Sequence, residues 1–393
     1  MRIAIYGGTF NPPHLGHISV ARSIYGQLRP DAFLIIPTNI PPHKAEAAGS
    51  PGAEERLGMC RLAFADIPGA EVSPMELRRS GKSYTSDTIS QLREEHPDDE
   101  LYLVVGTDMF LSFREWNRYR YLLDNCILTV LSRETDDRAD ILAFKAQLEK
   151  ENGARVELVK HEPLPMSSEE IRRKLKLRQG ADMLCDSVYS LIIQKRWYGA
   201  QPELGWLRDK VRPYLTEKRR AHVAGCEKQA VLMAERWGED IGRAAEAAIL
   251  HDITKKPDDD EQLRMCGRYG IILDAAERES PKILHARTGA AFARELFGIP
   301  DDIYGAIRWH TTGKPDMSLL EKIIYLADFT EPTRDFEGVE RLRARCFEDI
   351  DAAMALGLEM SLEDIRSYNA VPFRDTVDAY NWYMKKTGGN TEC

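Results

Sequence analysis

The sequence GGTFNPPHLGH, at residues 7–17, follows a short apolar run at residues 3–6 and leads into a helical pattern from Ser19 onward. Glycines at a strand-to-helix turn let the backbone approach a ligand closely, and the helix start presents free N–H groups to an anion. His14 and His17 add imidazole donors that can hydrogen-bond phosphate oxygens during group transfer. This stretch therefore predicts an α/β domain with a phosphate-binding turn after its first strand.

Five short apolar runs, separated by amphipathic segments, divide the first half of the chain. Several of them are unbroken sequences of Val, Ile and Leu, which is typical of strands that are buried on both faces of a sheet. The runs lie at residues 3–6, 33–36, 101–105, 127–131 and 156–159. Because helical segments separate them, the sequence predicts a parallel α/β sheet.

The sequence pattern changes after YGAQP at residues 198–202. Ala, Leu, Arg and Glu at helical spacing dominate from there onward, and strand signals almost disappear. A chain of 393 residues also exceeds the roughly 100 to 200 residues that one domain usually needs. We therefore expect an α/β domain at residues 1–199, a linker at 200–206 and an all-α domain at 207–393.

Composition excludes several classes of protein. Fifty-four Lys and Arg against 63 Asp and Glu give a formal net charge of −9, which argues against a general binder of nucleic acid or of anionic membranes. No apolar run approaches the roughly 18 residues of a membrane span. The N-terminus does not resemble a signal peptide, and the seven cysteines include no CxxC pair. These features predict a cytoplasmic protein.

Residues 7–17 resemble the HxGH signature of the nucleotidyltransferase superfamily, in the version carried by nicotinate-mononucleotide adenylyltransferases. Five later stretches resemble motifs of that family in the same order. They are PPHK at 41–44, SYTSDT at 83–88, GTD at 106–108, Trp116 and MSSEEIR at 166–172. Glu169 stands where the family usually has Thr. The resemblance covers nearly all of residues 1–199 and implies a nucleotidyltransferase domain with a Rossmann-like parallel sheet.

This resemblance also implies two sets of binding residues. The ATP-binding set is Gly7, Gly8, Thr9, Phe10, His14, His17, Gly106, Asp108, Ser167, Ser168 and Arg172. The set for nicotinate mononucleotide is His43, Lys44, Tyr84, Thr85 and Trp116. His14, His17 and Arg172 are the implied catalytic residues for transfer of AMP from ATP, carried with Mg²⁺, to nicotinate mononucleotide.

Features of this half also have physical interpretations that do not depend on the resemblance. Ser167 and Glu170 have the spacing of a capping box, so a helix N-terminus there can receive a polyphosphate, with Arg172 one turn further on. The glycine turn also fits an unrelated dinucleotide-binding loop, Trp116 also fits ordinary packing, and residues 43–44 also fit a solvated loop. The sequence does not separate the acid from the amide form of the substrate.

Histidines and aspartates recur at helix ends in the second half of the chain. His251 and Asp252 end one apolar helical segment, and Asp328 ends another. A carboxylate at the C-terminal end of a buried helix needs a strong compensating partner, and a metal ion is the simplest. The candidate ligands are His222, His251, Asp252, His285, His310 and Asp328. Four histidines and two aspartates suit two metal ions that share a bridging carboxylate.

The order H…HD…H…H…D resembles the HD-domain phosphohydrolase superfamily. Residues 310–313 (HTTG), 325–328 (YLAD) and 331–339 resemble more closely the bacterial HD hydrolases that split diadenosine tetraphosphate into two ADP. The match runs over most of residues 207–385. It implies a di-iron site, with Mn, Co or Zn as alternatives.

The resemblance implies a role for each residue of this second site. One ion has the ligands His222, His251, Asp252 and Asp328, and the other has Asp252, His285 and His310. Lys255 and Arg334 are the candidates for neutralising the polyphosphate, and Asp252 and Lys255 are the implied catalytic residues.

Several interpretations of the second half stay open at this point. The six residues could be unconnected, or the domain could be a non-hydrolysing nucleotide sensor that regulates the first half. It could also hydrolyse another phosphorylated nucleotide, or only one of the two domains could be active. The expected partners are ATP, nicotinate mononucleotide and diadenosine tetraphosphate, without nucleic acid or membrane, and the oligomeric state is open.

Overall fold

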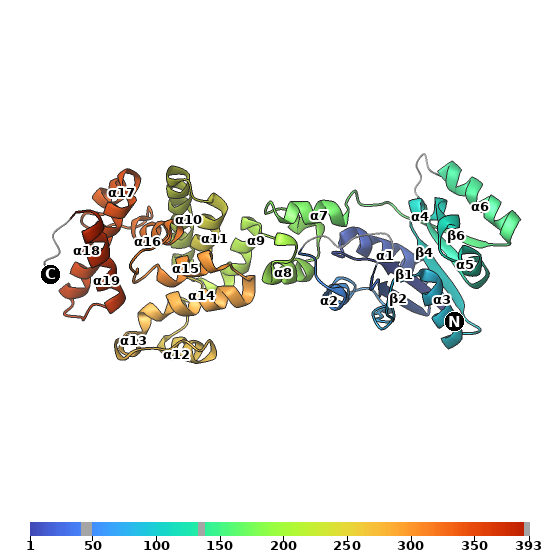
Figure 1. Ribbon diagram of the computed structural model, residues 1–393, viewed down its shortest axis with the longest axis horizontal. Helices are drawn as coiled ribbons and strands as arrows, with labels where there is room; N and C mark the ends of the chain where they lie inside the picture. The colour runs from blue at the N-terminus through green and yellow to red at the C-terminus, as the bar shows by residue number, and fades with distance from the viewer. Residues whose placement is uncertain (41–48, 133–137, 389–393) are drawn as a thin grey trace. The chain divides into compact units, whose positions relative to one another are not determined.

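The computed structural model describes residues 1–40, 49–132 and 138–388, and the chain divides into two compact units (Figure 1). Unit 1 is Met1–Gln201 and unit 2 is Pro202–Cys393. The first helix of unit 2, α9 (Leu204–Val211), begins inside the predicted linker of residues 200–206.

Unit 1 is built on a sheet of six parallel strands in the order β3-β2-β1-β4-β5-β6. The strands are β1 (Arg2–Gly8), β2 (Ala32–Pro37), β3 (Ala70–Val72), β4 (Glu100–Val105), β5 (Ile127–Ser132) and β6 (Arg155–Lys160). The chain builds outward from β1 to β3 and then returns to add β4 on the other side of β1. In such sheets ligands bind beyond the carboxyl ends of the two strands where the order reverses, here β1 and β4.

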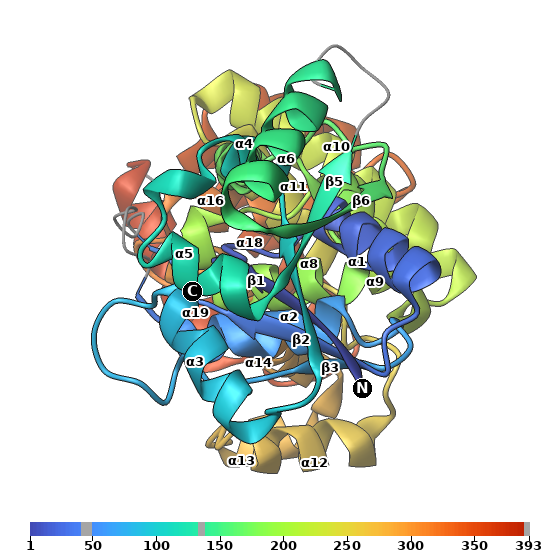
Figure 2. The same cartoon turned by 90° about the vertical axis from the view of Figure 1, so that its right-hand side faces the viewer.

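The predicted parallel α/β architecture is confirmed, and each of the five apolar runs is a strand. The sequence missed β3, because its three residues at the sheet edge, Ala70, Glu71 and Val72, do not form an apolar run. The helices of this unit are α1 (Leu15–Leu28), α2 (Ala53–Ala63), α3 (Thr85–Glu95), α4 (Thr107–Leu111), α5 (Tyr119–Asn125), α6 (Arg138–Asn152), α7 (Ser168–Leu175) and α8 (Asp186–Lys195). Figure 2 shows α1 and α3 on opposite sides of β1 and β2.

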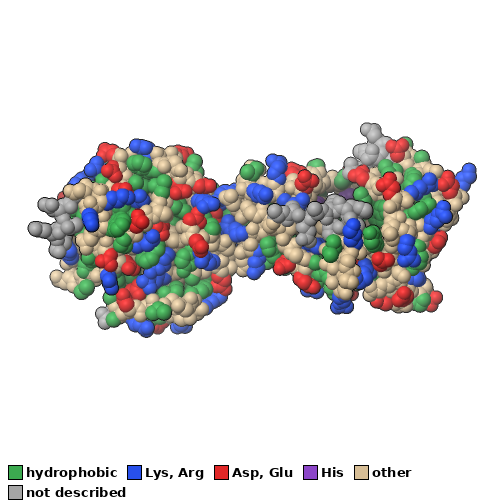
Figure 3. Space-filling view, in the orientation of Figure 1, with side chains coloured by type: hydrophobic (Ala, Val, Ile, Leu, Met, Phe, Trp, Pro, Cys, Tyr) green, Lys and Arg blue, Asp and Glu red, His purple; other side chains and the backbone are tan. Residues whose placement is uncertain are grey.

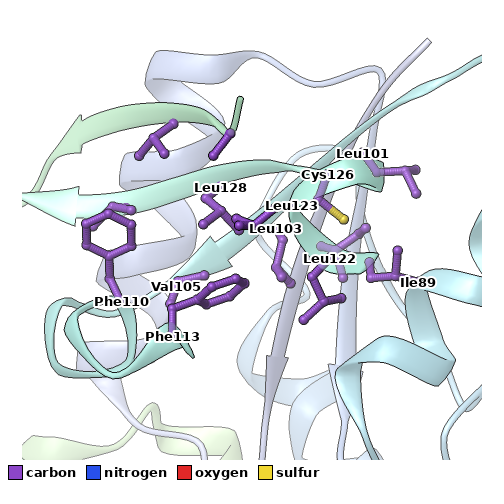
Figure 4. Packing of buried hydrophobic residues seen from close by; sticks show 14 of the residues in the cluster. Ile89, Leu101, Leu103, Val105, Phe110, Phe113, Leu122, Leu123, Cys126 and Leu128 are labelled. Atoms are coloured by element: carbon purple, nitrogen blue, oxygen red, sulfur yellow. The ribbon is translucent and has the colours of Figure 1, made fainter. Parts of the chain in front are cut away.

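One hydrophobic core of unit 1 joins the central strands to the helices that follow β3 and β4. Figure 4 shows Leu103 of β4 and Leu128 of β5 next to Leu122 and Leu123 of α5. Phe113, which follows α4, is fully buried in the same cluster. This packing fixes the carboxyl end of β4 and the residues that follow it.

The described elements of unit 2 are helical throughout, as the sequence predicts. They include α10 (Glu217–Trp237), α11 (Ile241–Leu250), α12 (Asp259–Arg268), α13 (Ala275–Glu279), α14 (Leu284–Phe297), α15 (Asp301–Trp309), α16 (Leu319–Thr330), α17 (Val339–Glu348), α18 (Ile350–Ser367) and α19 (Arg374–Lys386). Ser318 and Glu321 form a capping box at the start of α16. Local cap chemistry therefore determines where this helix, which carries Asp328, begins.

The surface carries charges of both signs. On the face shown in Figure 3, basic and acidic side chains are interspersed over both units. In the described part of the chain, no helix combines the length and the apolar character that a bilayer crossing requires.

Candidate active sites

The turn after β1 brings His14 and His17 together at the start of α1. The backbone N–H of His14 donates a hydrogen bond to Nδ1 of His17 at 3.1 Å, and the two ring centroids are 3.7 Å apart. A Cβ atom at Gly16 would lie 2.9 Å from Nδ1 of His14. Residue 16 must therefore lack a side chain for the two imidazoles to adopt this arrangement.

Burial determines the protonation of both rings. Burial lowers the pKa of His14 to about 4, and burial together with the neighbouring His14 lowers the pKa of His17 well below its ordinary value. Both imidazoles are therefore neutral at pH 7. Within the described residues, the buried Nδ1 of His14 has no hydrogen-bond partner. Since an orphaned buried N–H is rarer than an orphaned acceptor, we infer that His14 carries its proton on Nε2.

The start of α7 is bound directly to the same turn. Ser167 caps the helix by accepting a hydrogen bond from the backbone N–H of Glu170 at 3.1 Å. The Ser168 hydroxyl donates to the carbonyl of Pro12 at 3.0 Å, and the Arg172 guanidinium donates to the carbonyl of Asn11 at 2.6 Å. Side chains that are far apart in the sequence thus hold the positive end of α7 beside the glycine turn.

A cavity of about 310 Å³ opens beside the two imidazoles. Gly106 and Asp108, which follow β4, line it together with His14 and His17. His161, which is in neither predicted set of binding residues, also lines it. Its side chain is buried and its Nδ1 lies 3.0 Å from the Ser23 hydroxyl. The available signal was its position directly after β6, where residues at the ligand-binding edge of a parallel sheet begin.

A second cavity, of about 790 Å³, lies beyond the carboxyl ends of β1 and β4. The predicted residues that line it are Gly7, Gly8, Thr9, Tyr84, Thr85, Gly106 and Trp116. The Trp116 ring packs on the buried ring of Phe113 at a centroid distance of 5.0 Å, which fixes its orientation at the cavity wall. Phe10 is buried instead, with its ring 5.0 Å from that of His17. His43 and Lys44 lie outside the described residues.

Two buried charged residues that the sequence did not single out support these cavities. Arg56 is 1% exposed and donates to the carbonyls of Thr9, Thr38 and Asn39, so it binds the glycine turn to the end of β2. Glu76 lines the larger cavity, where burial raises its pKa. These contacts depend on long-range packing, and no local sequence motif predicts them.

In unit 2, all six predicted metal-binding side chains converge. The contacts between histidine Nε2 and carboxylate oxygens are His222 to Asp328 at 3.1 Å, His251 to Asp252 at 3.5 Å, His285 to Asp252 at 3.2 Å and His310 to Asp252 at 3.7 Å. The ligand atoms come from α10, the end of α11, α14, the end of α15 and α16.

Asp252 lies between two groups of histidines. Its Oδ2 is 3.6 Å from Nε2 of His222 and 3.5 Å from Nε2 of His251. Its Oδ1 approaches Nε2 of His285 and His310 instead. This is the arrangement that a carboxylate bridging two metal ions requires.

Hydrogen bonds orient three of the imidazoles toward the centre. Nδ1 of His251 lies 2.7 Å from the carbonyl of Ala248, and Nδ1 of His310 lies 2.7 Å from the carbonyl of Ile307. A carbonyl only accepts, so both Nδ1 atoms carry the proton and leave the Nε2 lone pairs free. Nδ1 of His222 likewise faces the carboxylate of the buried Glu331 at 3.0 Å. Such outer partners are typical of metal-binding histidines.

The charge state of the centre also fits divalent cations. Burial by itself would raise the pKa of Asp252, but the histidines around it hold that pKa well below its ordinary value. Burial by itself would also raise the pKa of Asp328. Its hydrogen bond with His222 has the larger share in lowering that pKa below its ordinary value. Two carboxylates and four inward-facing imidazoles form a nitrogen and oxygen donor set for borderline or hard ions.

Three cationic side chains surround the centre. Arg219 donates to Oδ2 of Asp252 at 2.7 Å, and Arg334 donates to Oδ1 of Asp328 at 2.7 Å. Nζ of Lys255 lies 3.0 Å from Nδ1 of His285. Lys255 and Arg334 were predicted, whereas Arg219 was missed, although it lies one helical turn before His222 on the same helix.

Comparisons with known proteins match the two units separately. The cytidylyltransferase-like family model matches residues 5–174, and the HD domain model matches residues 219–333. The symmetrical bis(5′-nucleosyl)-tetraphosphatase of Halalkalibacterium halodurans is 40% identical over 172 residues, which are 44% of this chain and 91% of that protein.

Two relatives carry the name "Probable nicotinate-nucleotide adenylyltransferase". The Geobacter metallireducens protein is 34% identical over 213 residues, which are 50% of this chain and 98% of that protein. The Geobacter sulfurreducens protein is 43% identical over 143 residues, 36% of this chain and 66% of that protein. Each relative therefore corresponds to half of this chain or less.

Proposed function

The chain joins a member of the nicotinate-nucleotide adenylyltransferase family to a member of the HD family that includes symmetrical bis(5′-nucleosyl)-tetraphosphatases, and from this membership we propose that it carries two catalytic activities. Unit 1 transfers AMP from ATP to nicotinate mononucleotide, which yields nicotinate adenine dinucleotide and pyrophosphate. Unit 2 hydrolyses diadenosine tetraphosphate symmetrically to two ADP. The partners of both units are small nucleotides.

The observation that carries the first activity is that two cavities meet at the carboxyl ends of β1 and β4. Tyr6, Gly106 and Met109 line both cavities, while His14 and His17 line the smaller one. Attack of one phosphate on another requires two polyanions side by side in a fixed orientation. The junction supports binding of the two substrates side by side, with the ATP phosphates beside His14 and His17 and the nicotinate ring beside Trp116.

The chain's own residues position and stabilise the reacting groups in this reaction. The substrate phosphate is itself the nucleophile, so no general base is needed, and Mg²⁺ enters with ATP. The neutral imidazoles of His14 and His17 donate hydrogen bonds to phosphate oxygens as charge develops on them. Ser168 and Arg172, at the positive end of α7, bind the departing pyrophosphate.

Replacement of His17 by Ala tests this proposal. Loss of one donor to the developing charge lowers kcat on the order of 10²- to 10³-fold with a much smaller change in KM. His96→Ala is the matched control, because this histidine pairs with Asp99 away from both cavities and its loss leaves kcat unchanged. Unchanged turnover of the His17 variant would remove the proposed role.

The observation that carries the second activity is the position of Asp252 between two histidine pairs, with one oxygen toward each. The proposed ligands are His222, His251, Asp252 and Asp328 for one ion and Asp252, His285 and His310 for the other. Two bound divalent ions supply the charge that neutralises an attacked phosphate and activates water. We propose iron for both positions, because the resemblance to the HD hydrolases implies a di-iron site. The donor set also suits Mn, Co or Zn, and affinity order alone does not choose among them.

Cationic side chains around the centre complete the proposed substrate site. Arg219, Lys255 and Arg334 neutralise the polyphosphate and orient it toward the bridging carboxylate. For a symmetrical substrate with four phosphates, attack at a β-phosphate releases ADP on both sides of the broken bond.

Chromatography of the products formed from diadenosine tetraphosphate by anaerobically purified protein tests the second activity. ADP as the sole product, abolished by Asp252→Ala, is the expected result. ATP with AMP would keep a hydrolase but overturn symmetrical attack. Ligand binding with two metal ions present and no cleavage would favour a nucleotide sensor or another phosphorylated substrate.

A further inference from the structure

Cys226 lies beside the first of the two proposed ion positions and has no part in the ligand set given above. It follows His222 by one turn of α10, so both side chains project from the same face of the helix. Its Sγ lies 3.5 Å from Nε2 of His222. Donor atoms of Cys226, His222, His251 and Asp328 all lie within 4.8 Å of one another, and the cysteine and both histidines are buried.

These distances suit a sulfur donor beside the nitrogen and oxygen donors already assigned to this ion. A nitrogen bound at about 2.1 Å and a sulfur bound at about 2.3 Å in a tetrahedral site lie roughly 3.6 Å apart. The 3.5 Å between Sγ of Cys226 and Nε2 of His222 meets this requirement. Nε2 of His222 is also 3.3 Å from Nε2 of His251 and 3.1 Å from Oδ1 of Asp328, so these two pairs fit the same ion.

Other buried cysteines of unit 2 have different surroundings. Cys266 packs against Leu273 and Leu284 in a small apolar cluster, as buried cysteines usually do. Cys346 is buried on α17 and belongs to neither group of candidate metal-binding side chains found among the described residues. Cys226 therefore differs from them in facing two imidazoles and a carboxylate.

We propose that Cys226 is a further ligand of the ion held by His222, His251, Asp328 and the bridging Asp252. The thiol binds as a thiolate: the Sγ–metal bond forms as the S–H bond breaks, and the proton passes to solvent. The other position, with Asp252, His285 and His310, offers nitrogen and oxygen donors. Because thiolates favour Fe²⁺, Co²⁺ and Zn²⁺ over Mn²⁺ and Mg²⁺, the two positions differ in metal selectivity. This inference rests on the proposed dinuclear site.

Cobalt substitution of the full-length protein tests the ligand directly. Metal-free protein is loaded anaerobically with Co²⁺, and its near-ultraviolet absorption is measured for a sulfur-to-cobalt charge-transfer band. The wild type and the control Cys346→Ala show the band, while Cys226→Ala and Cys226→Ser both lack it. Retention of the band in either Cys226 variant, or its absence from cobalt-loaded wild type, overturns the proposal.

Metal competition gives a second readout that does not depend on hydrolysis. In Cys226→Ser, the affinity for Zn²⁺ of the position with His222, His251 and Asp328 falls at least tenfold, while the affinity of the same position for Mn²⁺ changes less than threefold. Equal effects on the two ions would overturn the proposal. Adenylyl transfer by unit 1 and the far-ultraviolet circular dichroism spectrum of each variant show whether the chain has folded.

The same experiments separate failure of this inference from failure of the proposed function. Visible cobalt absorption without a charge-transfer band rejects the cysteine ligand and keeps the two-ion site. No cobalt uptake by the wild type rejects both. A cysteine ligand together with no cleavage of diadenosine tetraphosphate keeps this inference and rejects the hydrolase.

Discussion

The two candidate sites are built in opposite ways. In unit 1, the central feature is contiguous in sequence, since His14, Gly16 and His17 belong to one turn after β1. In unit 2, the ligands come from five helix segments and meet only in the folded unit. The first site uses neutral imidazoles and a helix N-terminus, whereas the second uses charged carboxylates held among imidazoles.

This contrast predicts that different kinds of substitution inactivate the two sites. A contiguous turn is sensitive to local backbone geometry, because a single added atom displaces a ring. A dispersed centre is sensitive to its electrostatic balance, because each carboxylate compensates for several buried partners. Substitutions that change only geometry or only charge therefore separate the two kinds of site.

Gly16→Ala tests the geometric side and has the largest expected effect. The new Cβ would lie 2.9 Å from Nδ1 of His14, so the ring must move. Because a misplacement of about 1 Å can cost on the order of 10²-fold in rate, we expect adenylyl transfer to fall about 100-fold with hydrolysis unchanged.

The matched control for this variant is Gly26→Ala on the same helix. A Cβ at Gly26 meets no atom within 4 Å, and alanine is favoured over glycine in a helix by about 1 kcal/mol. The control should keep full transfer activity. Equal losses in the two variants would attribute the effect to α1 as a whole rather than to His14.

Glu331→Gln tests the electrostatic side with a smaller expected effect. The buried carboxylate of Glu331 faces Nδ1 of His222 and holds Nε2 toward the centre. Loss of such an outer partner typically lowers metal affinity about 10- to 100-fold, so we expect a loss near the lower limit, because the amide oxygen can still accept.

Metal affinity, measured by competition with a chelator, gives the readout for Glu331→Gln. Glu321→Gln is the control, because this glutamate is also buried but lies in the first turn of α16, where it belongs to the capping box and pairs with Lys314. Equal losses of affinity in both variants would indicate a general effect on the helix. Adenylyl transfer should stay unchanged in both.

Sequence patterns predicted the features of each site that depend on local chemistry. Strands β2, β4 and β5 are buried over most of their length, so apolar runs revealed them, whereas the edge strand β6 exposes Arg155, Glu157 and Lys160. The family resemblances of both halves are confirmed by the comparisons. The spacing of Ser167 and Glu170, three residues apart, predicted the N-terminus of α7, where Ser167 is the cap. Such a cap can be predicted because both of its residues lie within one helical turn of the sequence.

Long-range contacts account for what the sequence did not show. Arg56 binds three carbonyls at the ends of β1 and β2, and only the folded sheet brings these carbonyls together. His161 enters the smaller cavity because β6 ends beside it. The partnership of Glu331 with His222 likewise joins residues far apart in the chain. A pattern of apolar and polar residues does not encode such pairings.

Ser167→Ala gives the smallest expected effect and asks whether a cap matters more at the first site than at the second. Ser167 caps α7, whose residues Ser168 and Arg172 bind the turn after β1, so loss of the cap weakens the helix by about 1 kcal/mol. If all of this free energy is lost from the binding of the transition state, adenylyl transfer falls about fivefold, since 1.4 kcal/mol corresponds to tenfold.

Ser318→Ala removes an equivalent cap from α16 and should lower thermal stability similarly, but Asp328 lies more than two turns from that cap and stays in place. Transfer and hydrolysis rates of both variants, measured with their melting temperatures, decide the comparison, and an unchanged transfer rate in Ser167→Ala would mean that contacts with the turn hold α7 without its cap.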